Sequence, residues 1–308
     1  MGQQSNHPDK HAYLIIAHKD DYTFRTLLRL LDDERNDLFI HMDMKNKAYR
    51  PIETNNLVKF SKVYHTSERI NVQWGGFSQI RAELLILHEA VSHGPYRYYH
   101  LLSGQDLPIK SQDHIHDFFE HNAGKEFICF ESDVFSHQRR VDKYHFFQET
   151  LGSEWRLSTS PVYMLNRILL KIQSLSGVKR NKSIDFKKGP NWFSITDDLA
   201  NFILGKEDWV QKTFKFTNCA DEVFLQTIVH DSDYANHLYY PKYDNDYHAI
   251  MRLIKWEGIR LHPHIWRITD KRELQGSDLL FARKFDCEVD KEIIDFVSGQ
   301  LCAQALPN

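Results

Sequence analysis

The regular alternation of predicted strands and helices in the first 132 residues restricts the fold of this chain more than any other feature of the sequence. The predicted strands are residues 11–18, 37–43, 96–104 and 126–132, and the predicted helices are residues 20–34, 77–91 and 111–122. The strands are short apolar runs, whereas the helices carry apolar residues at helical spacing. This alternation indicates an α/β fold with a parallel-type sheet and helices on both faces.

The second half of the chain is less regular. We expect a helix at 162–175, a strand leading into a helix at 191–204, and a further helix at 221–230. Between them, residues 176–190 form a basic segment punctuated by Gly and Pro, long enough to be a functional loop.

No repeat or linker interrupts the sequence, so we predict one domain over residues 11–308 after a disordered segment at 1–10. Within it, residues 11–132 are the expected nucleotide-binding half. Residues 133–308 are the expected half for the acceptor and the diphosphate.

Composition excludes several classes of function. The formal net charge is −3, so no overall basic field favours a nucleic acid as partner. The four cysteines are widely spaced and form no CxxC pair, which is typical of free thiols in a reducing compartment. The polar N-terminus is unlike a signal peptide, and no apolar run reaches 18 residues. We therefore predict a cytoplasmic protein without a transmembrane segment, and leave peripheral membrane contact open.

The sequence does not favour a metal site. Asp43 ends a predicted strand, but Lys45 stands where an Asp-x-Asp metal motif would have its second carboxylate. The Asp-Ser-Asp at 231–233 follows a helix and is better explained as a helix end. The pair His114 and His116 would face different sides of a helix, and the extended His-Pro-His at 262–264 lacks a third ligand.

Polar residues follow several predicted strands at their carboxyl ends, where ligands bind in open α/β sheets. By this rule His18, Asp43, residues 103–106 and Glu131 would border one cleft. Asp106 itself could be a turn former or a substrate contact.

Asp221 and Glu222 open a predicted helix. They could stabilise the helix dipole, or one of them could be a general base.

Two adjacent cations, Arg283 and Lys284, lie in the apolar stretch "GSDLLFARKFD" at 276–286. Charged side chains in such a setting either bind an anion or extend their heads into water while the stems pack. The stretch alone favours snorkelling for both residues, whereas the missing metal motif creates a need for fixed cations somewhere in the site.

The ordered set "IIAHKD", "IHMDMK", "VQWGGFSQIRAEL", "YYHLLSGQDLPIK", "GPNWFSIT", "DEVFLQT" and "LFARKFD" resembles the core-2/I-branching β-1,6-N-acetylglucosaminyltransferases and the related peptide xylosyltransferases. This is glycosyltransferase family 14, and the resemblance runs from about residue 11 to about residue 290. It implies a GT-A fold, a single domain with a mixed central sheet flanked by helices. It also implies inverting transfer from a UDP-sugar without a metal ion or other cofactor.

The resemblance assigns roles to individual residues. Glu222 matches the catalytic base, and Lys284 matches a lysine that binds the diphosphate. Arg260 fits best as the second diphosphate ligand, with Arg267 as competitor. Asp43 also matches on the nucleoside side, and Asp106 and Trp192 match on the substrate side. We further expect His18 to contact UDP, and Glu131 and Trp74 to contact the substrate.

The implied donor is most simply UDP-N-acetylglucosamine, and the implied acceptor is a carbohydrate or glycolipid hydroxyl in β-1,6 linkage. Xylosyl or other UDP-sugar transfer is the alternative within the family. A non-catalytic nucleotide-sugar-binding module and a metal-dependent enzyme are the alternatives outside it. The animal members are membrane-anchored and rich in disulfides, so this chain looks like a bacterial cytoplasmic relative.

Overall fold

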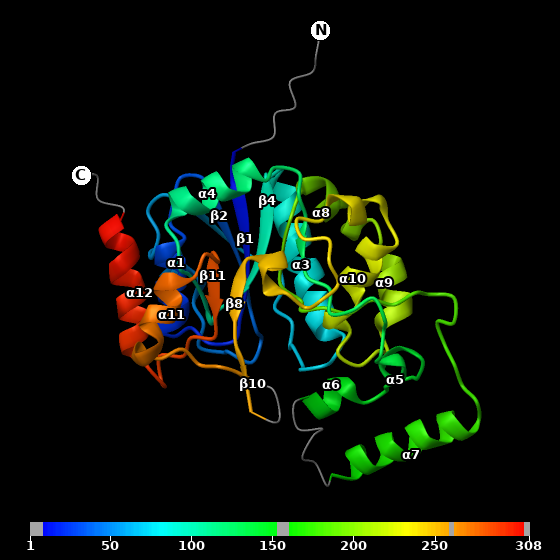
Figure 1. Ribbon diagram of the computed structural model, residues 1–308. Helices are drawn as coiled ribbons and strands as arrows, with labels where there is room; N and C mark the ends of the chain where they lie inside the picture. The colour runs from blue at the N-terminus through cyan, green and yellow to red at the C-terminus, as the bar shows by residue number, and fades with distance from the viewer. Residues whose placement is uncertain (1–8, 153–159, 259–261, 305–308) are drawn as a thin grey trace.

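The computed structural model describes residues 9–152, 160–258 and 262–304 (Figure 1). Most of the N-terminal segment predicted to be disordered, and Arg260, therefore lie outside the described residues. Among the described residues, no helix is long and apolar enough to cross a membrane.

A six-stranded mixed sheet, in the order β3-β2-β1-β4-β7-β6, forms the centre of the molecule. Its strands are β1 (His11–Ala17), β2 (Asn36–Met42), β3 (Lys62–His65), β4 (Tyr98–Ser103), β6 (Phe127–Ile128) and β7 (Phe193–Ile195). Strands β1, β2, β3 and β4 are parallel. The sequence predicted three of them but not the short β3, and the predicted strand 126–132 is reduced to β6. The expectation of a purely parallel-type sheet is corrected by β7, which runs antiparallel to β4 and β6. The mixed sheet of the predicted GT-A fold is confirmed.

Helices cover both faces of the sheet (Figure 1). On one side lie α1 (Tyr22–Leu30), α4 (Gln112–His121), α11 (Lys271–Gly276) and α12 (Lys291–Gln304); on the other lie α3 (Ser78–His93), α8 (Asp197–Leu204), α9 (Glu207–Phe214) and α10 (Phe224–His230). Strand β1 shows why both faces need cover. Ala12 and Leu14 belong to one hydrophobic core, whereas Tyr13 and Ile15 belong to the other. Alternate side chains of a strand point to opposite faces, so a strand that is apolar at every position is buried on both.

Several helices begin at caps that can be recognised in the sequence. Asp21 accepts a hydrogen bond from the Phe24 amide at the start of α1, and Thr196 does the same for Leu199 in α8. Helix α3 has no side-chain cap of its own. Instead Glu149, far away in the sequence, accepts hydrogen bonds from the backbone N–H of Ser78 (2.8 Å) and from its hydroxyl (2.7 Å). This contact fastens the irregular second half to the start of α3.

A second, three-stranded sheet brings distant motifs together. Its strands are β5 (Asp106–Pro108), β8 (Arg252–Ile254) and β11 (Phe281–Arg283), in the order β5-β11-β8. Strand β11 is antiparallel to β5, and its register places Arg283 opposite Asp106. The motifs "QDLPI" and "FARKFD" are therefore neighbours in space although they lie about 180 positions apart.

Apart from the fifteen-residue α7, the remaining elements are short. They are α2 (Pro51–Asn55), α5 (Gln138–Val141), α6 (Gln148–Leu151), α7 (Pro161–Leu175), β9 (Trp256–Glu257), β10 (His262–Pro263) and the 3-10 turns η2 (Ala220–Glu222), η3 (Asp233–His237), η4 (Tyr247–Ile250) and η5 (Ile268–Asp270). Residues 176–190 contain neither helix nor strand, as predicted for a loop. The predicted helix 221–230 begins with η2 and continues as α10 from Phe224.

Candidate active site

The carboxyl ends of the central parallel strands bring the first predicted site residues together. His18 follows β1 and Asp43 follows β2, and the Asp43 amide donates to the Ala17 carbonyl (2.8 Å). The Gly104 amide after β4 donates to the Ile16 carbonyl (3.1 Å), so this strand ends at the same edge. His18 is exposed, whereas Asp43 is buried.

Arg283 is held in a buried cluster that joins the two motifs. Its guanidinium bonds to the Asp106 carboxylate (2.7 Å) and to the Ser103 hydroxyl. The Trp192 ring lies 4.7 Å from the guanidinium carbon, and its indole N–H donates to the other Asp106 oxygen (3.1 Å). Only 16% of the Arg283 side chain and 3% of the Asp106 side chain are exposed. Snorkelling was therefore the wrong interpretation of Arg283, whose head is paired inside the protein.

Lys284, next to Arg283, has no such partner. It is half-buried, and no carboxylate forms an ion pair with it in the part of the chain that the structure describes. Burial and the neighbouring Arg283 lower the pKa of the Lys284 ammonium. Burial, followed by Lys284 and Lys19, likewise lowers the pKa of His18. We call Lys284, His18, Lys19 and Arg283 the cation cluster. An anion bound there would relieve the repulsion between these groups.

Glu222 lies in a second cluster whose charges are matched. Arg140 of α5 donates to Oε2 of Glu222 (2.8 Å), and the Lys188 ammonium lies 3.7 Å from the same oxygen. Lys188 also pairs with Glu131 (2.7 Å). We call these four residues the base cluster. The Glu222 side chain is 37% exposed, and among the described residues nothing donates a hydrogen bond to its Oε1.

The acidic pair at the start of η2 divides into an inner and an outer carboxylate. Asp221 is buried, and its carboxylate accepts a hydrogen bond from Gln79 (3.0 Å). Burial and the adjacent Glu222 raise the pKa of Asp221 to about 7. Burial and Asp221 in turn raise the pKa of Glu83 well above its ordinary value. Of the two acids that open this segment, Glu222 is therefore the one that faces solvent.

A short segment, residues 188–192, joins the base cluster to the Arg283–Asp106 pair. Lys188 lies in the first and Trp192 contacts the second, and their Cα atoms are no more than about 14 Å apart because only three residues lie between them. The Gly189 amide donates to the Glu222 carbonyl (2.9 Å). A Cβ at Gly189 would lie 2.0 Å from the Cys129 carbonyl oxygen, so only glycine fits at this position.

Trp74 and Asp43 are placed by the loop that crosses from β3 to α3. Trp74 is exposed, and the next residue, Gly75, accepts a hydrogen bond at its carbonyl from the Cys219 amide (3.0 Å). The loop thus packs against the turn that carries Glu222.

The Asp43 carboxylate accepts a hydrogen bond from the Lys45 amide (2.8 Å) and lies 3.4 Å from the Lys45 ammonium. The residue that replaces the second metal ligand is therefore a cation paired with the first.

Of the predicted ligands for the diphosphate, Arg260 lies outside the described residues. Its competitor Arg267 is exposed and follows Trp266, whose amide donates to the Lys284 carbonyl (3.0 Å). Arg267 is thus attached next to Lys284 through the backbone.

Histidine-rich segments are involved in local packing. His116 is buried and bonds to Asn36 (2.8 Å), whereas His114 is exposed, so the two rings face different sides as predicted. His264 pairs with Glu257 and Asp270, each at 2.7 Å. Within the described residues, no three His, Cys, Asp or Glu side chains are grouped so that they could hold a metal ion.

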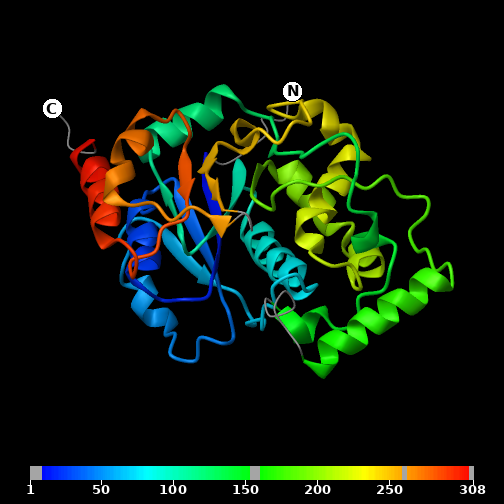
Figure 2. The same ribbon diagram turned by 60° about the horizontal axis from the view of Figure 1, so that its bottom comes forward.

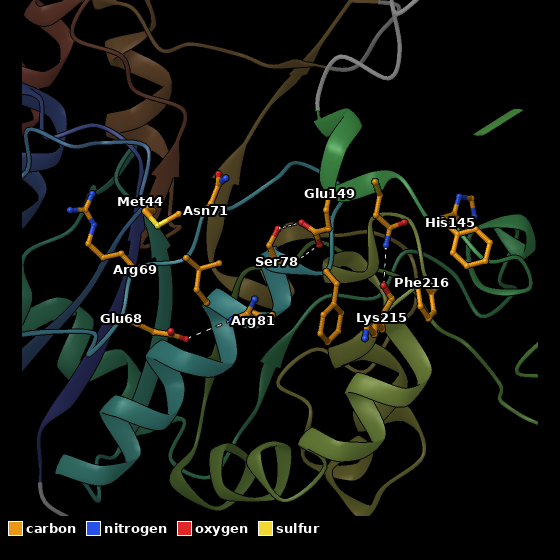
Figure 3. A pocket seen from close by; sticks show the side chains of 14 residues that line it. Met44, Glu68, Arg69, Asn71, Ser78, Arg81, His145, Glu149, Lys215 and Phe216 are labelled. Atoms are coloured by element: carbon orange, nitrogen blue, oxygen red, sulfur yellow. Dashed lines mark hydrogen bonds and ion pairs between the residues drawn. The ribbon is translucent and has the colours of Figure 1, made fainter. Parts of the chain in front are cut away.

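A pocket of about 550 Å³ lies beside these clusters and contains none of the predicted site residues (Figure 3). It lies between the start of α3, the loop after β3, and the segments around Glu149 and Phe216. Its lining residues are Met44, Glu68, Arg69, Ile70, Asn71, Phe77, Ser78, Arg81, His145, Phe146, Gln148, Glu149, Lys215 and Phe216. This pocket therefore does not coincide with the predicted site residues.

Sequence reasoning missed Arg140 and Lys188. Lys188 belongs to the basic loop 176–190, which was singled out as functional, and it directly precedes "GPNWF". Arg140 lies in a polar, irregular segment without any pattern that would distinguish it from Arg139.

Comparison with known proteins identifies the family of the chain. A family model described as "Branch: Core-2/I-Branching enzyme" matches residues 11–278. The chain is 25% identical over 294 residues to human N-acetyllactosaminide beta-1,6-N-acetylglucosaminyl-transferase, covering 89% of this chain and 68% of that protein. It is 23% identical over 332 residues to human beta-1,3-galactosyl-O-glycosyl-glycoprotein beta-1,6-N-acetylglucosaminyltransferase 3, covering 96% and 68%. It is 22% identical over 321 residues to dog xylosyltransferase 2, covering 96% of this chain but 34% of that protein.

Proposed function

This chain belongs to the core-2/I-branching enzyme family of glycosyltransferases, and we propose that it moves a sugar from a UDP-sugar to a carbohydrate hydroxyl with inversion and without a metal ion. The proposed donor is UDP-N-acetylglucosamine and the proposed linkage is β-1,6, which are the transfers named in two of the similar human proteins. The observation that carries the proposal is the position of Glu222. It is a solvent-facing carboxylate that is held through one oxygen. Residues 188–192 connect its cluster to Trp192 and the Arg283–Asp106 pair.

Glu222 is the proposed general base. An inverting transfer is a single in-line displacement at the anomeric carbon, and it needs one carboxylate on the acceptor side. Arg140 and Lys188 hold Oε2, so Oε1 can accept the proton of the acceptor hydroxyl as that oxygen attacks. Glu131 belongs to the base cluster, and Trp74 lies in the loop that packs against the turn carrying Glu222. Both are proposed to contact the sugars.

Lys284 is proposed to bind the departing UDP. Negative charge grows on the β-phosphate as the glycosidic bond breaks, and fixed cations can stabilise it in place of a metal. Lys284 is suited to this because it has no carboxylate partner among the described residues and lies beside His18. The second ligand is proposed to be Arg260 or Arg267, and Asp43 is proposed to lie on the nucleoside side. Asp106 acts through Arg283, which it orients together with Trp192.

Xylosyl transfer is the second candidate, because the chain is also similar to a xylosyltransferase over nearly its whole length. A non-catalytic nucleotide-sugar-binding module remains the alternative outside enzymes. We propose a cytoplasmic location, which is supported by the lack of any disulfide among the four cysteines in the part of the chain that the structure describes.

A panel of UDP-sugars separates these candidates. Each donor is incubated with the protein, and both UDP binding and slow donor hydrolysis are measured. The proposal expects UDP-N-acetylglucosamine to bind and to be hydrolysed fastest. A preference for UDP-xylose would establish the second candidate, and binding of UDP without turnover of any donor would support the non-catalytic module.

A further inference from the structure

Helix α7 (Pro161–Leu175) exposes large apolar side chains to solvent. None of its fifteen residues is buried. Its outward-facing apolar residues are 45–79% exposed and are Met164, Leu165, Ile168, Ile172 and Leu175. In both views α7 lies at the periphery, apart from the central sheet and the helices that cover it (Figures 1 and 2). Surface helices ordinarily turn their apolar stripe inward, so this orientation needs an explanation.

The half-buried side of the helix is mixed, with Val162, Tyr163, Leu169 and Leu170 beside two polar residues. At 3.6 residues per turn, the five exposed apolar residues fall within an arc of about 100°. Asn166 and Gln173 lie on the opposite, half-buried side. Gln173 accepts a hydrogen bond from the Tyr144 amide (2.8 Å) and donates one to the Tyr144 carbonyl (3.0 Å). Because these polar contacts fix the helix, the apolar stripe is held outward.

Positive charge accompanies the apolar stripe. Arg167 and Lys171 are exposed and lie along one edge of the arc. Residues 155–184 contain six Lys or Arg and no Asp or Glu, in a chain whose formal net charge is −3. The cationic character is therefore local to α7 and its flanks.

We propose that α7 binds to the surface of a membrane that contains anionic lipids. An apolar stripe with cations at its edge is the pattern of helices that lie in the bilayer interface. The apolar side chains would enter the boundary between headgroups and acyl chains, while Arg167 and Lys171 would contact lipid phosphates. Fifteen residues extend about 22 Å, less than the hydrocarbon thickness of about 30 Å, so the helix lies along the interface.

The anchoring of α7 also relates the membrane to the base cluster. Tyr144, which holds Gln173, follows α5 by three residues, and α5 carries Arg140, the partner of Glu222. Docking through α7 would therefore hold the base cluster close to the bilayer. The membrane contact itself does not depend on the proposed transfer, because it involves neither Glu222 nor Lys284.

Vesicle co-sedimentation of the full chain tests the proposal. Vesicles of phosphatidylcholine with about one third phosphatidylglycerol are compared with vesicles of pure phosphatidylcholine. The wild type should bind the anionic vesicles, and Ile168→Glu/Ile172→Glu should weaken binding by about tenfold or more. Arg167→Gln/Lys171→Gln should weaken it by about fivefold for each cation removed. These substitutions are at exposed positions, so the fold is retained, and circular dichroism verifies this.

Matched controls lie elsewhere on the surface. Ile52→Glu changes an exposed isoleucine of α2, and Lys59→Gln/Lys62→Gln removes two exposed cations. Neither control should alter vesicle binding. The proposal is overturned if the wild type does not bind anionic vesicles or if the α7 variants bind as well as the controls. Self-association that is lost in Ile168→Glu/Ile172→Glu, without vesicle binding, would assign the stripe to a second copy of the chain instead.

Discussion

The base cluster and the cation cluster are connected by residues 188–192 but balance their charges differently. In the base cluster two acids, Glu131 and Glu222, are matched by Arg140 and Lys188. In the cation cluster Asp106 neutralises Arg283 and Glu288 pairs with Lys19, but Lys284 is left without a carboxylate among the described residues. The matched region can fix a carboxylate in position, whereas the unmatched one can receive an anion. Their difference corresponds to the two requirements of an inverting transfer.

Removing the pair between Asp106 and Arg283 should have the largest effect, and this effect is on the stability of the protein. Asp106→Ala should destabilise the protein by about 3–5 kcal/mol, because Arg283 would keep a largely buried charge without its counter-ion. Urea denaturation measures the free energy of unfolding. Lys19→Ala, which breaks an exposed pair, is the control and should cost about 1 kcal/mol or less. Equal losses in the two variants would contradict the structural role of the Asp106–Arg283 pair.

Glu222→Gln should change the proposed function of the base cluster, which is transfer, and leave unchanged the proposed function of the cation cluster, which is UDP binding. The transfer rate should fall by about a hundredfold or more, because the amide cannot accept the proton. UDP affinity should be retained, since the cation cluster is unchanged. Initial rates and calorimetric titration of UDP provide the two measurements. Turnover close to that of the wild type would remove Glu222 as the base.

Lys284→Ala should have the converse effect on binding. A charged contact to phosphate typically contributes about 1.5–3 kcal/mol, so UDP affinity should fall by about 10- to 100-fold. Lys19→Ala again serves as control, because Lys19 already pairs with Glu288 (3.2 Å) and should matter less. Unchanged UDP affinity in Lys284→Ala would show that the phosphate binds elsewhere.

The smallest expected effect is a dependence of stability on pH. The pKa of Asp221 is raised to about 7, so the folded protein favours its protonated form. Its contribution to stability is therefore present below its ordinary pKa and is lost as the pH rises through about 7. Denaturation at pH 5 and pH 8 should show a smaller stability difference in Asp221→Asn than in the wild type. If Asp221→Asn and the wild type show the same stability difference between pH 5 and pH 8, the raised pKa of Asp221 is contradicted.

Three of the four parallel strands and the helices between them could be predicted from the sequence because apolar periodicity determines both, whereas the short, partly exposed β3 carries no such signal. Strand β7 is three residues long and pairs antiparallel to β4, so its place in the sheet depends on tertiary contacts that periodicity does not encode. For the same reason the environment of Arg283 could not be inferred. The sequence shows its apolar neighbours but not Asp106, which only the pairing of β5 with β11 brings opposite it.

The rule for strand ends predicted that His18, Asp43 and Asp106 follow strands at one edge of the sheet, and the structure places them there. The roles of Glu222 and Lys284 come from the family resemblance and stay predictions. Arg140 and Lys188 were not predictable, because exposed cations are common and their role depends on which carboxylate the fold places beside them.

Dependence on a metal ion tests the central claim most directly, since fixed cations are proposed to replace it. The initial rate of transfer from UDP-N-acetylglucosamine is measured after extensive dialysis against EDTA, and again with added Mn²⁺. The account predicts the same rate in both conditions. A rate that vanishes in EDTA and returns with Mn²⁺ would contradict the proposal that Lys284 and its neighbouring cations stabilise the leaving UDP.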